Sequence, residues 1–172
     1  MNSVNERLLA ELTTKDDLAF QLGDTLDVKG SIVMVVITFL GTQTAYLLDK
    51  HVYGPSHVIQ AVSVLCLVAA TVFSILELWP RTYVMIEPES NVAKRIPELI
   101  AHYSQFNDGA LEPNVLNQLT LEQIGWAKSR ISSNKAINAL KSGWLEKAFY
   151  ATAIAFCLNA VTLVLVWLTH PF

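Results

Sequence analysis

The sequence predicts an all-α membrane protein with three transmembrane helices, an N-terminal cytoplasmic helix and a helical cytoplasmic insert between the second and third spans. Apolar residues make up 52% of the 172 residues, and most of the apolar excess lies in three blocks that contain no charged residue. A bilayer core about 30 Å thick is crossed by about 20 mostly apolar residues in a helix. The three blocks are residues 31–48, 58–76 and 148–169, and each is long enough to be a span.

A buried helix of a water-soluble protein is the alternative interpretation of each block. Such a helix keeps one polar face toward water, whereas these blocks are apolar on every face. Trp79 and Trp144 lie just beyond span ends, and Trp167 lies near the far end of the third block, as is typical of tryptophans at membrane–water interfaces. Cys66 and Cys157 fall inside the blocks. We expect them to be small buried apolar residues rather than disulfide partners or zinc ligands.

The distribution of Lys and Arg predicts the orientation. Residues 1–30 carry three of the twelve, the loop 49–57 carries only Lys50, residues 81–147 carry eight, and residues 170–172 carry none. Eleven therefore lie on one side, which the positive-inside bias makes cytoplasmic. We expect a multi-pass protein of the inner (plasma) membrane with its N-terminus inside and its C-terminus outside. The first 26 residues carry five acidic residues before any apolar run, so we expect no secretory signal peptide.

The chain divides into four expected regions: an arm at 1–28, a transmembrane hairpin at 29–80, an insert at 81–145 and a third span with a short external tail at 146–172. The arm should be helical over 4–22, with a break or a new cap at 13–17, because apolar residues recur there at helical spacing. These residues are Leu8, Leu9, Leu12, Leu18 and Leu22.

The insert should form two helices separated by a turn at 107–109. The first is expected over 91–106. The second is expected to begin near Pro113 or at Thr120, where Thr120 and the residues after it resemble a capping box, and to continue unbroken into the third span. A head of this size cannot bury a large core alone. We therefore expect a homo-oligomer, with docking to the membrane surface as an alternative.

No catalytic constellation is recognisable. The sequence contains no G-x-x-x-x-G-K-[ST], G-x-S-x-G, H-E-x-x-H or C-x-x-C motif, and three of the four histidines fall on the expected outer side. We expect no enzymatic activity, no cofactor and no metal site. The net charge of −3 gives no basic face for a nucleic acid polymer, which leaves the lipid bilayer as the expected partner.

Neutral polar residues inside the spans are the remaining chemical signal, because no ionisable residue lies in mid-span. Asn159 is nearly central in the third span, while Gln43 and Gln60 lie near the outer leaflet and are expected to pair across the hairpin. Asn159 needs a hydrogen-bonding partner in hydrocarbon. Bonding within one three-helix bundle, bonding between subunits and lining of a pore all remain open.

Asp27-Val28-Lys29-Gly30 leads directly into the first span, and the insert carries His102-Tyr103 and a run from Gln123 to Leu140 that includes Asn134-Lys135. With the acidic N-terminal helix, the hairpin and the final span, this layout resembles the transmembrane effector family of bacterial Pycsar anti-phage defence over nearly the whole chain. Gly30 stands where Ala is commoner in that family, and Ala136 stands where an aromatic residue often follows the lysine.

The resemblance implies an effector that responds to a cyclic pyrimidine nucleotide, cUMP or cCMP, made by a partner cyclase after infection, and that then impairs the inner membrane. A non-catalytic membrane scaffold or accessory subunit and a small channel are the alternatives. Basic residues of the head are candidates for binding a nucleotide phosphate or for coupling, and those on matching motifs rank highest. The candidates are Asp27, Lys29, Arg130, Asn134 and Lys135.

Overall fold

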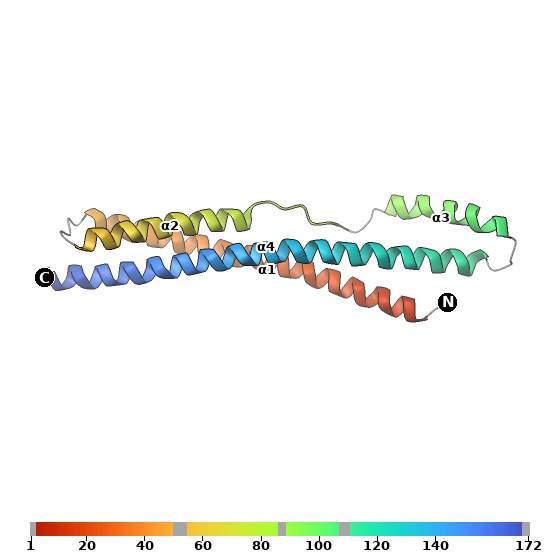
Figure 1. Cartoon of the computed structure of the whole chain (residues 1–172), viewed down its shortest axis with the longest axis horizontal. Helices are drawn as coiled ribbons and strands as arrows, with labels where there is room; N and C mark the ends of the chain where they lie inside the picture. Colours follow the sequence, from red (N-terminus) through yellow and green to blue (C-terminus); the bar gives the residue numbers. More distant parts are fainter. Residues whose placement is uncertain (1–2, 50–54, 86–88, 107–110, 170–172) are drawn as a thin grey trace. The chain divides into compact units, whose positions relative to one another are not determined.

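The computed structural model describes residues 3–49, 55–85, 89–106 and 111–169. In these ranges the chain is helical apart from residues 79–85 and contains no strand. The helices are α1 (Ser3–Asp49), α2 (Pro55–Leu78), α3 (Glu89–Tyr103) with a short 3-10 helix η1 (Ser104–Phe106), and α4 (Leu111–Thr169) (Figure 1). The helices α1, α2 and α4 are long and apolar enough to cross a membrane, which confirms the all-helical, three-span prediction.

The arm and the first span form one uninterrupted helix. The hydroxyls of Thr13 and Thr14 donate hydrogen bonds to the carbonyl oxygens of Leu9 and Ala10, at 3.0 and 3.1 Å. Threonines that satisfy their hydroxyls on the preceding turn are compatible with a helix interior. The break or new cap expected at 13–17 is therefore wrong.

α4 joins the insert to the third span in 59 residues, as the absence of a breaker predicted. It begins at Leu111, which agrees with the start expected near Pro113 and not with the one at Thr120. Thr120 lies inside it and donates to the carbonyl oxygen of Leu116 at 2.8 Å, so the capping-box interpretation is wrong. The turn predicted at 107–109 lies outside the described residues.

The chain separates into two compact units, and α1 and α4 contribute residues to both. Unit 1 comprises Met1–Leu22 and Arg81–Ile137. In it Leu12 of α1 packs against Ile124, Ala127 and Ile131 of α4. This cluster is small, as expected for a head of this size.

The arm is helical over the predicted residues 4–22, but the leucines that predicted the helix do not all lie on its buried face. Leu18 and Leu22 are 58% and 51% exposed, although Leu12 is buried. Between Leu12 and Leu22 the buried positions are Asp16 and Ala19. Leucine spacing therefore predicts the helix of the arm without identifying which face is buried.

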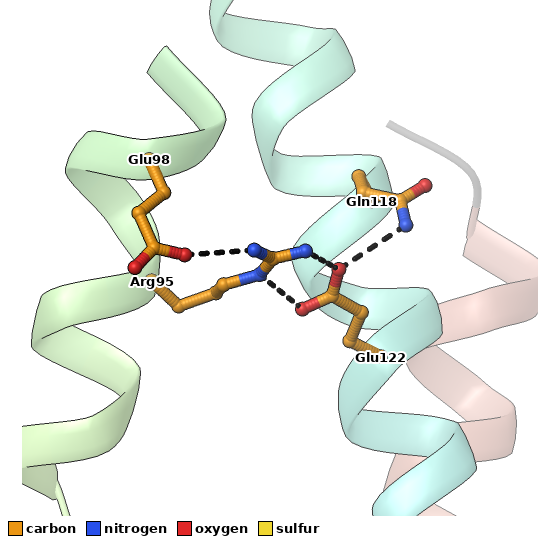
Figure 2. Close-up of polar contacts among 4 residues, drawn as sticks. All are labelled: Arg95, Glu98, Gln118 and Glu122. Carbon is orange, nitrogen blue, oxygen red and sulfur yellow. Dashed lines mark hydrogen bonds and ion pairs between the residues drawn. The ribbon is translucent and has the colours of Figure 1, made fainter. Parts of the chain in front are cut away.

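In unit 1, α3 is attached to α4 by the guanidinium of Arg95 (Figure 2). Its Nε and Nη2 donate to the two carboxylate oxygens of Glu122 at 3.0 and 2.8 Å. Nη1 donates to Glu98, one turn along α3, at 2.8 Å, and Gln118 donates to Glu122 at 3.3 Å. A bidentate contact of this kind fixes the orientation of the guanidinium relative to the carboxylate as well as the distance between them. The contact lowers the pKa of Glu122 below its ordinary value of 4.5, because the hydrogen bonds from Arg95 favour the charged carboxylate.

Unit 2 comprises Gly23–Pro80 and Asn138–Phe172 and contains the three apolar blocks. Its contacts show that α1 and α4 run in the same direction: Asp27 meets Lys141, and farther along Thr44 meets Asn159. α2 runs the opposite way. Three candidate spans that alternate in direction are the arrangement that three successive crossings require.

The apolar contacts of unit 2 come from all three helices. Their buried centre is small and lies in the middle of the apolar blocks. It consists of Ile37, Leu40, Leu67, Ala70 and Ala155.

Candidate functional site

The buried positions of α2 recur at alternating steps of three and four residues. This spacing keeps one face toward neighbouring helices packed at a shallow left-handed angle, as in coiled coils. Four of the six positions carry polar side chains. A bundle that is surrounded by lipid and packed through apolar contacts would instead carry apolar side chains at these buried positions. The six are Gln60, Ser63, Leu67, Ala70, Ser74 and Glu77. We refer to them as the polar seam.

Around Gln60 and Ser63, at the end of the seam that begins α2, polar groups of the other two helices lie nearby. Thr44 Oγ1 lies 3.0 Å from Asn159 Oδ1 and 2.8 Å from the carbonyl oxygen of Leu40, so its proton is shared between two acceptors. Ser63 Oγ donates to the carbonyl oxygen of Ala155 at 3.4 Å. Asn159 Nδ2 is buried and has no hydrogen-bonding partner in the described parts of the chain. Asn159 thus bonds within the bundle, one of the three possibilities left open by the sequence, but only through its oxygen.

Gln60 does not pair with Gln43. Gln60 is 1% exposed, and neither its Nε2 nor its Oε1 has a hydrogen-bonding partner among the residues that the structure describes. Gln43 is half-buried and lines a shallow groove beside Tyr46 and Leu163. The predicted pairing across the hairpin is therefore wrong, because the two amides occupy different faces.

Glu77 lies at the opposite end of the seam and is fully buried, with 0% of its surface exposed. Among the described residues neither carboxylate oxygen has a hydrogen-bonding partner, and the group interacts electrostatically with Asp27 and Lys141. It fits there because position 30 is glycine: a Cβ at Gly30 would collide with Glu77 Oε2 and lie 2.8 Å from its Cδ. The departure from the commoner Ala thus makes room for a carboxylate.

Asp27 and Lys141 form the ion pair of this region. Lys141 Nζ donates to Asp27 Oδ1 at 2.5 Å, and the side chains are 4% and 44% exposed respectively. Lys29, two residues along α1, is exposed and lines a groove with Glu146, Phe149 and Tyr150. Asp27 and Lys29 therefore serve different partners, as their spacing on a helix suggests.

The remaining candidates lie in unit 1. Asn134 is fully buried; its Oδ1 accepts from the backbone N–H of Val84 at 3.0 Å, and its Nδ2 donates to the Val84 carbonyl at 3.2 Å. Arg130 Nε donates to Asp16 Oδ2 at 3.0 Å. Lys135 is exposed. Asn134 and Arg130 thus hold other segments of unit 1 against α4.

The apolar helices, the helical insert and the placement of the Asp27 and Asn134 motifs fit one kind of protein. A family model described as "Pycsar effector protein domain" matches residues 13–168. The chain belongs to the Pycsar effector family. No curated protein and no solved structure matches it. Membership makes it an effector of antiviral defence, and its three apolar helices support a multi-pass membrane protein.

In this Pycsar effector the sequence patterns did not predict the most buried charged groups, which are Asp16, Glu77 and Lys141. The signal that could have identified Glu77 is its place in the three-and-four spacing from Gln60 onward. Cys157, expected to be buried, is exposed, and Cys66 is partly buried. Across the described ranges no three His, Cys, Asp or Glu side chains are grouped to hold a metal ion.

Proposed function

We propose that this effector is gated by a cyclic pyrimidine nucleotide, cUMP or cCMP, and impairs the integrity of the inner membrane. The match to the Pycsar effector family over residues 13–168 carries the proposal. The three apolar helices supply a membrane part on which such an effector would act. The positive-inside bias supports a cytoplasmic N-terminus and insert, where a nucleotide made in the cytoplasm would be met.

Two of the candidate residues are suited to contact the phosphate directly. Lys29 and Lys135 are exposed, and no ion pair of either is found among the described contacts. An ammonium group that is not committed to a carboxylate can donate to a phosphate oxygen. Lys29 in addition lies beside two aromatic rings of its groove, and a pyrimidine could stack on such a ring.

The other charged candidates are suited to coupling. Asp27 is paired with Lys141, and Arg130 is paired with Asp16. Either residue would contact a nucleotide only by giving up that pair. An arriving phosphate that competes for Arg130 would release the arm from α4, which is a local electrostatic switch of the usual kind.

A homo-oligomer is part of the proposal. Large apolar side chains cover the outer faces of all three candidate spans, and these faces can contact lipid or another copy. Within the bilayer, helix association depends on packing rather than on hydrophobic burial.

The test is membrane depolarisation in living bacteria. The full chain is expressed with an inducible cyclase that makes either cUMP or cCMP, and a potential-sensitive dye reports the membrane potential. Depolarisation is expected with an active cyclase and not with a catalytically dead one. Lys29→Gln and Lys135→Gln are expected to raise the nucleotide level required, while Lys128→Gln, an exposed lysine on the same α4, serves as the matched control. Full expression without depolarisation under either nucleotide would refute the proposal.

A further inference from the structure

The interior of unit 2 contains polar groups that its own structure does not satisfy. Four buried side chains lack hydrogen-bonding partners within the part of the chain that the structure describes: the amide of Gln60, the Nδ2 of Asn159, the hydroxyl of Ser74 and both oxygens of Glu77. Hydrocarbon offers no replacement, so each such group costs free energy in a membrane-spanning bundle. Four residues of this kind on adjacent helices indicate an environment that contains water in some state of the protein.

Another copy of the chain cannot satisfy these groups while unit 2 keeps this packing. Gln60, Ser74 and Glu77 are at most 1% exposed, so a neighbour would reach only the outer faces. On the outer faces, in contrast, polar groups can be satisfied within their own helix. The exposed hydroxyl of Thr38 donates to the carbonyl oxygen of Met34 at 2.9 Å and needs no outside partner.

We propose that the polar seam of α2 lines a cation-conducting path that opens when the three candidate spans separate, with Glu77 at its cytoplasmic end. The proposal rests on the proposed function, because it names the physical means by which this effector impairs the membrane. In the closed packing the apolar residues Leu67 and Ala70 of the same face block the path. Separation hydrates the polar groups and removes the cost of leaving them unpaired.

The charges at the inner end favour cations. Glu77 and Asp27 carry two negative charges when ionised, and Lys141 carries one positive charge, so the cluster is net negative. Oxygen atoms of amides and hydroxyls farther along the seam can replace part of a cation's hydration shell. A negative ring at a narrow entrance concentrates counter-ions and excludes anions.

Cysteine accessibility tests the lining directly. In a chain carrying Cys66→Ala and Cys157→Ala, seam variants Ser63→Cys and Ser74→Cys are compared with their neighbours Val64→Cys and Ile75→Cys, which are 37% and 46% exposed on the outer face. Serine and cysteine are nearly equal in size, so folding should be kept. A charged, membrane-impermeant thiol reagent is applied with the cUMP or cCMP cyclase switched on or off.

Modification of the two seam cysteines should rise at least about tenfold with the cyclase on, and it should block the depolarisation. The outer-face cysteines should stay unmodified, because a thiol in lipid does not ionise. Depolarisation with unmodified seam cysteines would overturn the path and leave the proposed function standing. Absence of depolarisation in the parent chain would overturn the proposed function and the path with it.

Ion selectivity provides a second measurement. The selectivity would not change in a Glu77 variant if Glu77 had only a structural role. Glu77→Gln keeps the size of the side chain and should lower the preference for K⁺ over Cl⁻ by about tenfold in proteoliposomes exposed to cUMP or cCMP. Thr44→Val, inside the bundle, should reduce the K⁺ flux. Thr38→Val removes the same hydroxyl from the outer face of the same helix and should not. Equal flux and selectivity in all of these variants would overturn the proposal.

Discussion

The ion pair between Asp16 and Arg130 should be the main contact that holds the arm against α4. The free energy lost when this pair is broken should depend on which partner is removed. The Asp16 side chain is 3% exposed and that of Arg130 is 13% exposed. Asp16 Oδ1 already lacks a hydrogen-bonding partner, so Arg130 supplies the one bond that the carboxylate is seen to receive. Arg130→Ala therefore leaves a buried, uncompensated charge.

The magnitudes follow from these burials. Removal of one partner of a buried pair costs about 3–5 kcal/mol, and we expect about 3 kcal/mol for Arg130→Ala. Asp16→Ala should cost only about 1.5 kcal/mol, the low end for a hydrogen bond to a charged group, because the partly exposed guanidinium can reach water. The double variant should cost less than the sum of the two, since no orphaned charge remains.

Amide hydrogen exchange of residues 4–22 in detergent micelles measures this local opening. A loss of about 3 kcal/mol corresponds to roughly 150-fold faster exchange. The matched controls are Lys128→Ala and Asp17→Ala, which remove exposed charges from the same two helices and should change exchange by about twofold or less. Exchange in Arg130→Ala no faster than in Lys128→Ala, or strict additivity in the double variant, would refute the reasoning.

Three further predictions concern other contacts. Pairing with Arg95 lowers the pKa of Glu122 below its ordinary value of 4.5. This pairing therefore stabilises the docking of α3 fully above that ordinary value, and the stabilisation is lost as pH falls through the lowered pKa. Spin-label distances between α3 and α4 should be constant from pH 7 down to the ordinary pKa of Glu122 and should broaden only at more acidic pH. Asn134→Leu should cost about 1–3 kcal/mol by leaving a backbone N–H and C=O unpaired, and exchange of the Val84 amide checks this. Gly30→Ala should stabilise the chain by up to about 1 kcal/mol in a Glu77→Ala background, because alanine favours a helix more than glycine does. It should not stabilise the native chain, where the new methyl group displaces the Glu77 carboxylate. Equal shifts in the melting temperature in both backgrounds would contradict this prediction.

The lengths and order of the helices were predictable because they depend on local signals. Charge-free blocks of about 20 residues identify spans, and the absence of a strong breaker after Pro113 predicted that α4 continues into the third one. The errors at 13–17 and at Thr120 have one cause. Threonine is a good cap, but it is also tolerated inside a helix when its hydroxyl bonds to the preceding turn, and sequence does not distinguish the two uses.

The inner faces were not predictable in the same way. In a soluble helix the buried stripe differs from the wet face in polarity, but lipid-facing residues are as apolar as packed ones. Val64, Leu65 and Val68 of α2 are exposed, while Ser74 and Glu77 are buried. Hydrophobicity therefore predicts that α2 spans the membrane and says little about its rotation. The pairing of Gln43 with Gln60 was wrong for this reason.

The register between α1 and α4 limits how the protein can open. Asp16 lies 114 residues before Arg130 in unit 1, and Asp27 lies 114 residues before Lys141 in unit 2. Sliding α4 along α1 by one turn, about 5.4 Å, would break both ion pairs at once and leave charges buried. Rotation or separation in unit 2 can instead retain the pair of unit 1. Under the opening of unit 2 proposed above, loss of the pair between Asp27 and Lys141 would remove one contact that sets the register, and the unsatisfied groups of the polar seam would favour hydration over reclosure.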